Sequence, residues 1–373
     1  MIPNYPESTR RTFARNVLEN TLRMNRGENL MIETWSATLP WAESFELEAR
    51  ILGARPILLV EDEATFWSAV ENAPASQVAR VGSHEWAALK ASDAHMFFWG
   101  PYDTVREQSL PDSVVAQIDA VDHEWFRLVA KRGIRCARWD LGRTNEAIAR
   151  EYGVDVDAWR GELVDAALVD PHTLQRDGRR IAQGLRRGKE VRITHPNGTD
   201  LTLRLAGRSP RIDDGVIDAD DLRTGNAVAV VPSGVTAVTV DENYAEGSYV
   251  GDSTGVMFYR MEPTALPAGT WTFRRGRLVQ YGFRTQAEAF ERAYPRLGPG
   301  KDRPGLLSVG LNPKLSRSPL LFDQGRGTIS LTIGRDAHQG GKTRTPHFTA
   351  YQLLHGATMT IDGETLVEAG DIR

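Results

Sequence analysis

The chain has 373 residues, of which 41% are hydrophobic and 25% are charged, values that are ordinary for globular proteins and disfavour long disorder and fibrous structure. At about 150 residues per domain, this length predicts two or three domains. The formal net charge of -4 gives no global electrostatic reason to bind nucleic acid or an anionic membrane, and the single cysteine, Cys136, excludes an internal disulfide or a cysteine-based metal site.

In the first half of the chain, apolar residues recur alternately at helical spacing and in short buried runs. This alternation predicts parallel βαβ units with right-handed crossovers. We expect helices over residues 9–26, 41–53, 63–73 and 112–131, and strands over 30–34, 54–60, 94–99 and 134–139.

Near residue 190 the pattern changes to many short strands. Residues 191–194 and 201–205 flank a Pro-Asn-Gly turn and predict a hairpin. Further strands are expected over 228–231, 235–240, 249–252, 270–275, 306–310, 327–333, 357–361 and 363–367, with one helix over 285–294. The fold class is therefore α/β plus α+β: an N-terminal parallel domain over residues 1–188, followed by a mixed, mostly antiparallel domain over residues 189–373.

Several common functional signals are missing from the sequence. It contains no P-loop, no dinucleotide-binding fingerprint and no Gly-x-Ser-x-Gly nucleophile elbow. Cys136 is interpreted as a small core residue on a strand, and the short arginine clusters at 179–180 and 186–187 as a solvated face. Residues 1–11 lack a cationic start before an apolar run, and no stretch reaches 18 apolar residues, so we expect a cytoplasmic protein.

The densest set of polar residues on glycine-rich turns lies at 323–349. This region contains two histidines, His338 and His347, together with Asp323, Asp336 and Lys342. Polar groups on turns that follow strands are where binding and catalytic sites are often built. A lone histidine, however, is more often a hydrogen-bonded structural residue than a ligand.

The second half of the chain resembles the thermophilic-aminopeptidase family of two-metal metallopeptidases, of the aminopeptidase T and aminopeptidase S type. The family pattern Leu-Pro-x-Gly-Glu-Val-Phe corresponds to residues 231–236, and Gly-Glu-Leu-Gly-Ile-Gly-Thr-Asn-Pro corresponds to 305–313. The pattern that opens with Glu-Lys corresponds to 323–334, the closing His-x-Asp to 347–349, and Val-Asp-Gly to 361–363. These motifs keep the family's order and approximate spacing, and the resemblance extends into the first half of the chain.

The resemblance implies a site for two divalent metals, held by three Glu, two His and one Asp, and the chain departs from that set. The six corresponding positions hold Val235, Leu306, Asp323, Ser330, His347 and Thr349. Aliphatic side chains cannot bind a metal, and a hard divalent pair needs anionic oxygens to offset its charge. We therefore predict that the two-metal site is lost, that no cofactor is bound, and that the pocket remains.

The resemblance places the candidate site residues around one cavity at the domain interface. The expected catalytic residues are His347 as general acid or base, Ser330 as hydrogen-bond partner or nucleophile, and Asp323. The expected substrate-binding residues are Asn312, Arg326, Lys342, Glu242, Thr349, Val235 and Leu306. Glu242 has an alternative interpretation as a residue that turns the chain after its strand, and Arg326 and Lys342 as surface charges.

Three functions remain open at this point. The first is a divergent, metal-independent enzyme with hydrolase- or lyase-type chemistry on a small amino-acid-derived or aromatic substrate. The second is a mononuclear iron enzyme that resembles the dihydroxypyridine ring-cleaving dioxygenases, with His338 or Asp336 replacing a missing ligand. The third is a non-catalytic protein with a binding or structural role. As partners we expect a small-molecule substrate and a second copy of the chain in a homodimer, without nucleic acid or membrane.

Overall fold

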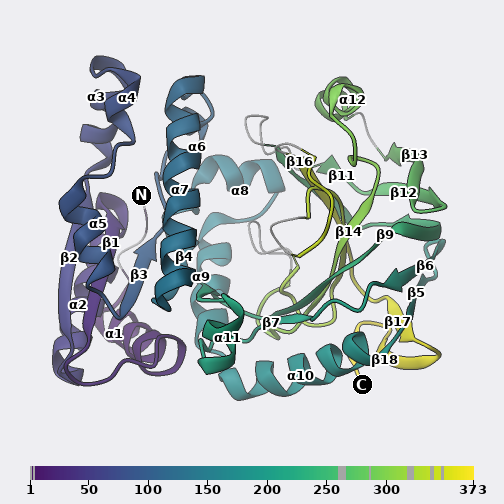
Figure 1. Cartoon of the computed structure of the whole chain (residues 1–373), viewed down its shortest axis with the longest axis horizontal. Helices are drawn as coiled ribbons and strands as arrows, with labels where there is room; N and C mark the ends of the chain where they lie inside the picture. The colour runs from purple at the N-terminus through teal and green to yellow at the C-terminus, as the bar shows by residue number, and fades with distance from the viewer. Residues whose placement is uncertain are drawn as a thin grey trace. The chain divides into compact units, whose positions relative to one another are not determined.

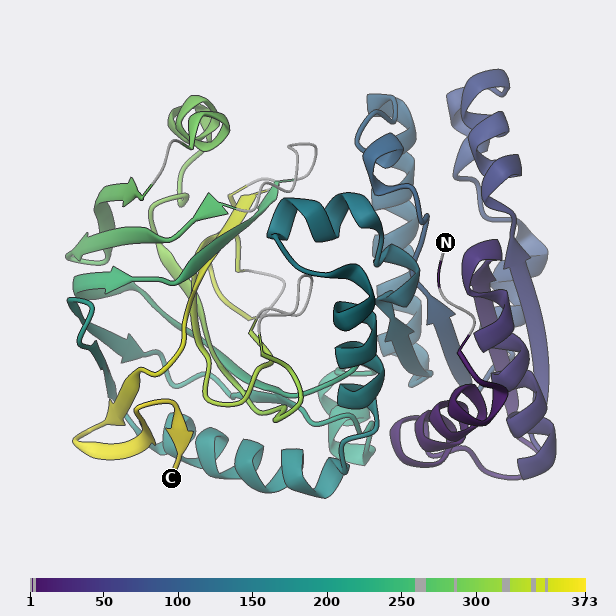
Figure 2. The ribbon, with the colours of Figure 1, turned by 180° about the vertical axis from the view of Figure 1, so that it is seen from behind.

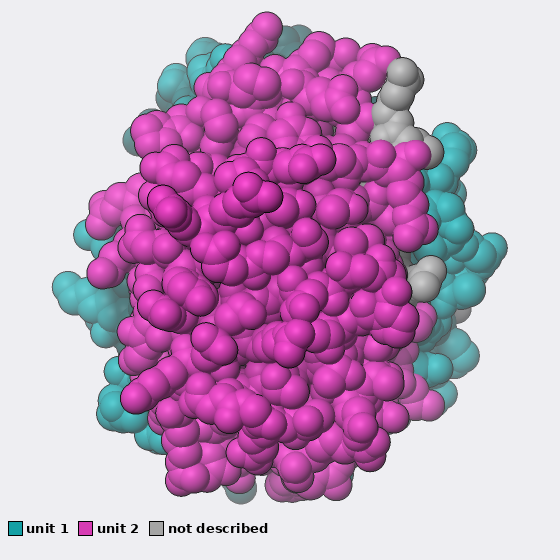
Figure 3. Space-filling model, turned by 90° about the vertical axis from the view of Figure 1, so that its right-hand side faces the viewer, with its two compact units in different colours: residues 1–171, 215–233 teal, residues 172–214, 234–373 magenta. Residues whose placement is uncertain are grey.

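The computed structural model describes residues 2, 5–258, 266–284, 287–316, 323–336, 340–345 and 348–373. The chain forms two compact units. The first unit consists of residues 1–171 and 215–233, and the second of residues 172–214 and 234–373, as the two colours of Figure 3 mark. No helix among the described residues is long and apolar enough to cross a membrane.

The first unit is built on a parallel five-stranded sheet, as the alternating pattern predicts (Figure 1). Its strands, in spatial order, are β2 (Arg55–Glu61), β1 (Asn29–Trp35), β3 (Ala94–Phe98), β4 (Arg135–Trp139) and β8 (Val228–Val231). Its helices are α1 (Glu7–Asn16), α2 (Leu39–Leu52), α3 (Glu63–Asn72), α4 (Ala75–Val78), α5 (Ser83–Lys90), α6 (Thr104–Glu107), α7 (Asp112–Arg132), α8 (Glu146–Tyr152), α9 (Val156–Ala167) and α11 (Ala219–Thr224).

Both faces of this sheet are covered by apolar side chains, as parallel sheets require. On one face an aromatic cluster joins Phe13 of α1, Trp41 and Phe45 of α2, and Trp139 of β4. On the other face, residues of α5 and α7 pack against Met31 and Cys136. Cys136 is fully buried, and burial raises the pKa of its thiol, so it is the core residue that the sequence suggests.

The first unit differs from the sequence-based expectation in three places. The helix expected over 9–26 is α1 followed by a π-helical turn at Val17–Thr21. The strand at 228–231, which we expected in the second domain, is β8 and pairs in parallel with β4. That pairing draws residues 215–233 into the first unit, whereas the expectation was a single boundary between residues 188 and 189.

The second unit contains a large sheet in which the pairings of the named strands are antiparallel, as the fold class predicts. Its strands are β5 (Glu190–His195), β6 (Thr199–Leu205), β7 (Arg211–Asp213), β9 (Val235–Val250), β10 (Ser253–Phe258), β11 (Leu266–Pro267), β12 (Gly269–Arg274), β13 (Arg277–Phe283), β14 (Pro304–Gly310), β15 (Ile329–Gly334), β16 (Phe348–Leu354), β17 (Thr358–Ile361), β18 (Glu364–Glu368) and β19 (Asp371–Ile372). Its helices are α10 (Pro171–Arg187) and α12 (Glu288–Ala293).

Strand β9 is long and joins the strands from β14 onward to the strands from β6 onward in the order of the sheet (Figure 2). Its first part pairs with β14 and β7, and its second part pairs with β6 and β12. The sequence suggested two strands, over 235–240 and 249–252, where the structure has one. Gly247 lies within β9 at a φ of 109°, a conformation that side-chain-bearing residues rarely adopt.

Candidate functional site

One face of the second unit's sheet is lined by hydroxyl groups. Strands β9, β14, β15 and β16 are successive neighbours, and their register aligns Ala237, Ser308, Ser330 and Leu353 in one row across the sheet. Because side chains alternate between faces, residues two positions away on each strand share the face of this row. We call this surface the hydroxyl face, after Thr239, Ser308, Ser330, Thr332 and Thr349.

The opposite face of the same strands is apolar core. It carries Val238, Leu307, Ile329, Leu331 and Ala350, all buried in one large hydrophobic cluster. The hydroxyl face is nevertheless shielded from solvent, since Thr239, Ser308 and Ser330 are each no more than 2% exposed. Polar groups that are shielded from solvent beside apolar ones make this face a candidate ligand site, because such sites combine apolar surface with a few placed polar groups.

Asp323 is the carboxyl group that meets this face. Ser308 Oγ donates a hydrogen bond to Asp323 Oδ2 at 2.9 Å. Ser330 lies directly opposite Ser308 on the neighbouring strand, where Cβ atoms of antiparallel pairs are about 5 Å apart. Burial raises the pKa of the Asp323 carboxyl, and this outweighs the hydrogen bond from Ser308. The group therefore keeps its proton to a higher pH than an exposed aspartate.

Four of the residues expected at the site share the hydroxyl face. They are Val235 at the start of β9, Leu306 on β14, Ser330 on β15 and Thr349 on β16. Each belongs to the row of Ala237, Ser308, Ser330 and Leu353 or lies an even number of residues from it on the same strand. The Leu306 amide donates to Thr332 Oγ1, and Thr349 Oγ1 donates to the Arg335 carbonyl oxygen. The face thus carries apolar groups and hydroxyls at these four positions.

Asn312 is fully buried and shapes the turn that presents Asp323. Its amide donates to the Gln324 carbonyl oxygen at 2.8 Å, its own carbonyl oxygen accepts from the Arg326 amide at 2.9 Å, and its Oδ1 accepts from the Lys314 amide. Two of these contacts are with the backbone of Gln324 and Arg326, which follow Asp323 in the chain. Asn312 therefore helps to position the backbone next to Asp323.

Of the three expected charged binding residues, two have side chains that are engaged with other protein groups. Glu242 is buried, pairs with Arg208 at 2.7 Å, and accepts a hydrogen bond from the Lys342 amide. Arg326 reaches Asp177 of α10 at 3.2 Å and Asp371 at 3.5 Å. The Lys342 side chain is exposed. Glu242 lies inside strand β9 rather than at a turn after a strand, so its role in the structure is that of a buried partner of Arg208.

Asp336 is a second buried carboxyl group near the edge of this region. Its Oδ1 accepts from the Thr343 amide at 2.7 Å, while Oδ2 has no hydrogen-bond partner among the described residues. Burial, with a contribution from the Glu242 charge, raises the pKa of Asp336 to about 6. His338 and His347 lie outside the described residues, so the structure says nothing of their distance from Ser330 or Asp336.

The residues present do not fit the two divalent metals that the resemblance implies. Two divalent cations need several anionic oxygens, and the described part of the hydroxyl face supplies neutral hydroxyls, two aliphatic groups and one carboxyl group. Across the described residues, no group of three or more His, Cys, Asp or Glu side chains is placed to hold a metal ion.

Sequence reasoning missed Ser308, Thr239 and Thr332. Their signal is a period of two: single hydroxyl residues stand among apolar ones on β9, β14 and β15. Each looks unremarkable on its own strand. Only the strand order and register bring them together.

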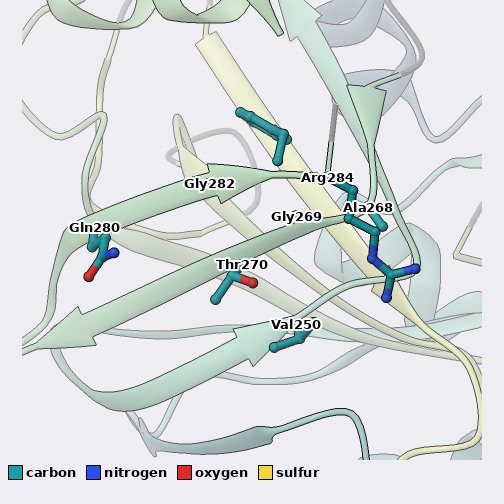
Figure 4. Close-up of a pocket in the computed structure, with 8 residues that line it drawn as sticks. Val250, Ala268, Gly269, Thr270, Gln280, Gly282 and Arg284 are labelled. Carbon is teal, nitrogen blue, oxygen red and sulfur yellow. The ribbon is translucent and has the colours of Figure 1, made fainter. Parts of the chain in front are cut away.

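A separate surface pocket lies at the far end of β9. It has a volume of about 350 Å³, and Figure 4 shows its lining on β12, β13 and the end of β9. The lining residues are Val250, Ala268, Gly269, Thr270, Gln280, Gly282, Phe283 and Arg284. None of them was expected at a site.

No protein-family model matches the sequence, and no curated protein matches it. Among solved structures, the chain is similar to AmpT (aminopeptidase T) from Thermus thermophilus, with a TM-score of 0.71 and 13% identity over 98% of this chain and 99% of that one. It is also similar to 2,5-dihydroxypyridine dioxygenase from Pseudomonas putida KT2440, with a TM-score of 0.64 and 14% identity over 99% of this chain and 98% of that one. Sequence identity this low shows similarity of fold only. The chain therefore has, over nearly its whole length, the fold of AmpT, in agreement with the resemblance of its motifs.

Proposed function

We propose that the chain is a divergent enzyme of aminopeptidase T type that has lost the two-metal site. It carries out metal-independent, hydrolase- or lyase-type chemistry on a small amino-acid-derived or aromatic molecule. The observation that carries this proposal is the hydrogen bond from Ser308 to the half-buried Asp323, beside Ser330 on the hydroxyl face.

The proposal rests on how the site has changed. On this face Thr239, Ser308 and Ser330 are buried hydroxyl residues, whereas Asp323, Val235 and Leu306 are half-buried, so polar and apolar groups are combined at its edge. Val235 and Leu306 supply an apolar wall without a buried unpaired charge. An apolar wall with a few convergent polar groups is the usual composition of a small-molecule site.

Asp323 is the proton-transfer group in this proposal. Burial raises the pKa of the Asp323 carboxyl group, so it keeps its proton to a higher pH than an exposed aspartate does, which suits a general acid. Ser308 orients the carboxyl group through Oδ2. Ser330 and Thr349 supply hydrogen bonds to polar groups of the substrate, and His347 remains the proposed complementary base on the strength of the resemblance.

The first test is the metal content of the purified protein by elemental analysis, together with the effect of EDTA. We expect no stoichiometric metal, and neither the melting temperature nor any activity should change with EDTA. Two equivalents of zinc, manganese or cobalt would overturn the proposal. So would a clear fall in melting temperature with EDTA, because a metal present at 100 times its dissociation constant stabilises the folded protein by about 2.7 kcal/mol. One equivalent of iron would instead favour the mononuclear iron alternative.

The second test is turnover of a panel of amino-acid amides, amino-acid 4-nitroanilides and N-acyl amino acids. Asp323→Asn should lower turnover by about two to four orders of magnitude, the usual contribution of a general acid. Asp200→Asn, which changes an exposed carboxylate on β6, should leave turnover unchanged. Substrate binding without turnover in the wild-type protein would favour the non-catalytic alternative.

A further inference from the structure

The sheet of the first unit ends on one side at β2, which pairs with β1 and with no further strand among the described residues (Figure 1). The Arg55 amide donates to the Glu28 carbonyl oxygen, so the odd-numbered residues of β2 direct their backbone groups toward β1. Because this direction alternates along a strand, the amides of Leu58 and Val60 and the carbonyl oxygen of Pro56 point outward. A row of outward backbone groups is a template for another strand.

The side chains along this edge are apolar and accessible. Ile57 and Val60 are 43% and 49% exposed, and Leu58 and Leu59 are half-buried. Ile51, near the end of the helix α2 that leads into β2, is 58% exposed. Single exposed apolar residues are ordinary on a protein surface, but several of them on one unpaired strand edge favour association with another strand.

The two ends of β2 carry opposite charges. Arg55 is the first residue of the strand and Glu61 is the last, and both are exposed. Neither side chain forms an ion pair with another residue in the part of the chain that the structure describes. Both charges are therefore available to a partner that lies along the edge.

This charge pattern fits a second copy of the same strand. An antiparallel pair of β2 strands with a two-fold axis at Leu58 sets Arg55 of each copy opposite Glu61 of the other, because both positions are three residues from the axis. Opposite residues of an antiparallel pair lie on the same face of the sheet. The same register sets Ile57 opposite Leu59, so an apolar row lies between the two ion pairs.

The backbone allows this register in spite of Pro56. The two Leu58 residues exchange hydrogen bonds across the axis, and each Val60 amide meets the Pro56 carbonyl oxygen of the other copy. Proline lacks an amide proton, so one potential hydrogen bond per strand is missing, and proline is tolerated on edge strands for this reason. Since β1 occupies the other edge of β2, the pairing closes at two copies and does not grow into a fibre.

We propose that the outer edge of β2 is an interface between two copies of this chain, which pair antiparallel about Leu58 and join two five-stranded sheets into one. Charge favours this occupant, because Arg55 and Glu61 complement each other when the same strand runs antiparallel, whereas a parallel pair sets like charges side by side. The interface lies in the first unit and does not depend on the function proposed for the hydroxyl face.

The first test is the dissociation constant of the dimer, measured by light scattering over a concentration series at low ionic strength. Arg55→Glu and Glu61→Arg should each weaken the dimer by about tenfold, because each variant sets like charges opposite each other at both ends of the interface. The double variant exchanges the two charges and should restore the wild-type constant. Glu364→Arg is the matched control, since it changes an exposed glutamate on β18 of the second unit, and it should leave the constant unchanged.

The second test addresses the register. Across a hydrogen-bonded antiparallel pair the two Cα atoms are about 5.5 Å apart, a distance that a disulfide spans. Oxidation of Leu58→Cys with diamide should therefore give a covalent dimer on a non-reducing gel. Cys136, the single native cysteine, is fully buried and contributes little background. Val279→Cys is the control, because Val279 is 54% exposed on β13 of the second unit, and it should not cross-link.

Three results would overturn the proposal. The first is a mass of one chain for the folded wild-type protein at high micromolar concentration. The second is a dimer that neither charge variant weakens, which would assign the contact to another surface of the chain. The third is cross-linking of Leu58→Cys that does not exceed that of Val279→Cys. The melting temperature of each variant shows whether it is folded, and the double charge variant provides a rescue that misfolding could not give.

Discussion

Two buried carboxyl groups close to the hydroxyl face have pKa values shifted in opposite directions. Burial raises the pKa of Asp336 to about 6, because one of its oxygens has no hydrogen-bond partner among the described residues. For Glu242, burial also raises the pKa, but the hydrogen bonds from Arg208 and from the Lys342 amide outweigh it, so the pKa is lowered. The number of donors around each carboxyl group decides the sign.

Asp336 should make the protein less stable as the pH rises. A carboxyl group whose folded pKa is raised contributes stability at pH values below its unfolded pKa, and this contribution is lost as the pH rises through about 6. Asp336→Asn removes that loss. The free energy of unfolding of the variant, relative to that of the wild type, should therefore rise by up to about 3 kcal/mol from pH 4 to pH 8. This figure follows from 1.36 kcal/mol for each unit of pKa shift.

Urea unfolding at the two pH values measures this change. Asp220→Asn is the control, since the Asp220 side chain is 84% exposed and its replacement should have the same small effect at both pH values. A constant difference between Asp336→Asn and wild type across this range would contradict the prediction.

Glu242 should behave in the opposite way. Glu242→Gln leaves the mostly buried Arg208 cation without its partner, and breaking a buried ion pair from one side costs about 3 kcal/mol at pH 7. A lowered folded pKa gives stability above the unfolded pKa, and this stability disappears as the pH falls through the folded pKa. The gap between variant and wild type should therefore narrow in acid. Thermal melts at pH 7 and pH 3.5 compare the two, and a gap that widens in acid would show that the pair does not stabilise the fold.

At the scale of elements, β9 is the strand on which the second unit depends. Gly247 allows it to continue from one part of the sheet to the next, and a Cβ atom there would lie 2.1 Å from the Asp200 carbonyl oxygen of β6. Since that oxygen belongs to backbone in a paired strand, it has little room to move. A glycine is therefore needed at position 247 for two reasons: its positive φ and the closeness of the Asp200 carbonyl oxygen.

Gly247→Ala should be much more destabilising than Gly198→Ala. Both glycines have a φ slightly above 100°, but a Cβ atom at Gly198 would meet nothing within 4 Å. Backbone strain alone costs about 1–2 kcal/mol, which is the expected loss at Gly198. At Gly247 the steric clash adds to that strain. Equal losses in free energy of unfolding for the two variants would show that the strand shifts freely to make room.

At the scale of the whole molecule, the homodimer stays a prediction. The motif resemblance implies a dimer, and closed two-fold dimers are the commonest soluble assemblies. Light scattering at micromolar concentration should give about twice the 41.4 kDa of one chain. A mass near that of one chain would contradict the prediction.

The sequence by itself determined the fold class and most of the elements. Period-two and helical patterns are local consequences of which side chains must be buried, so β1 to β4, α7 and the β5–β6 hairpin appear close to where the sequence predicts them. The same local patterns could not assign β8 to the first sheet, or join two predicted strands into β9. Pairing partners depend on residues distant in the chain.

The candidate site divides in the same way. That Val235 and Leu306 cannot be metal ligands is visible in the sequence, because an aliphatic side chain has no donor atom wherever it lies. Only the tertiary structure decided that Ser308 contacts Asp323, and that Arg326 and Glu242 are held by other charges. Hydrogen bonds and ion pairs depend on distances of a few ångströms between strands, and those distances are set by register and packing rather than by any local pattern.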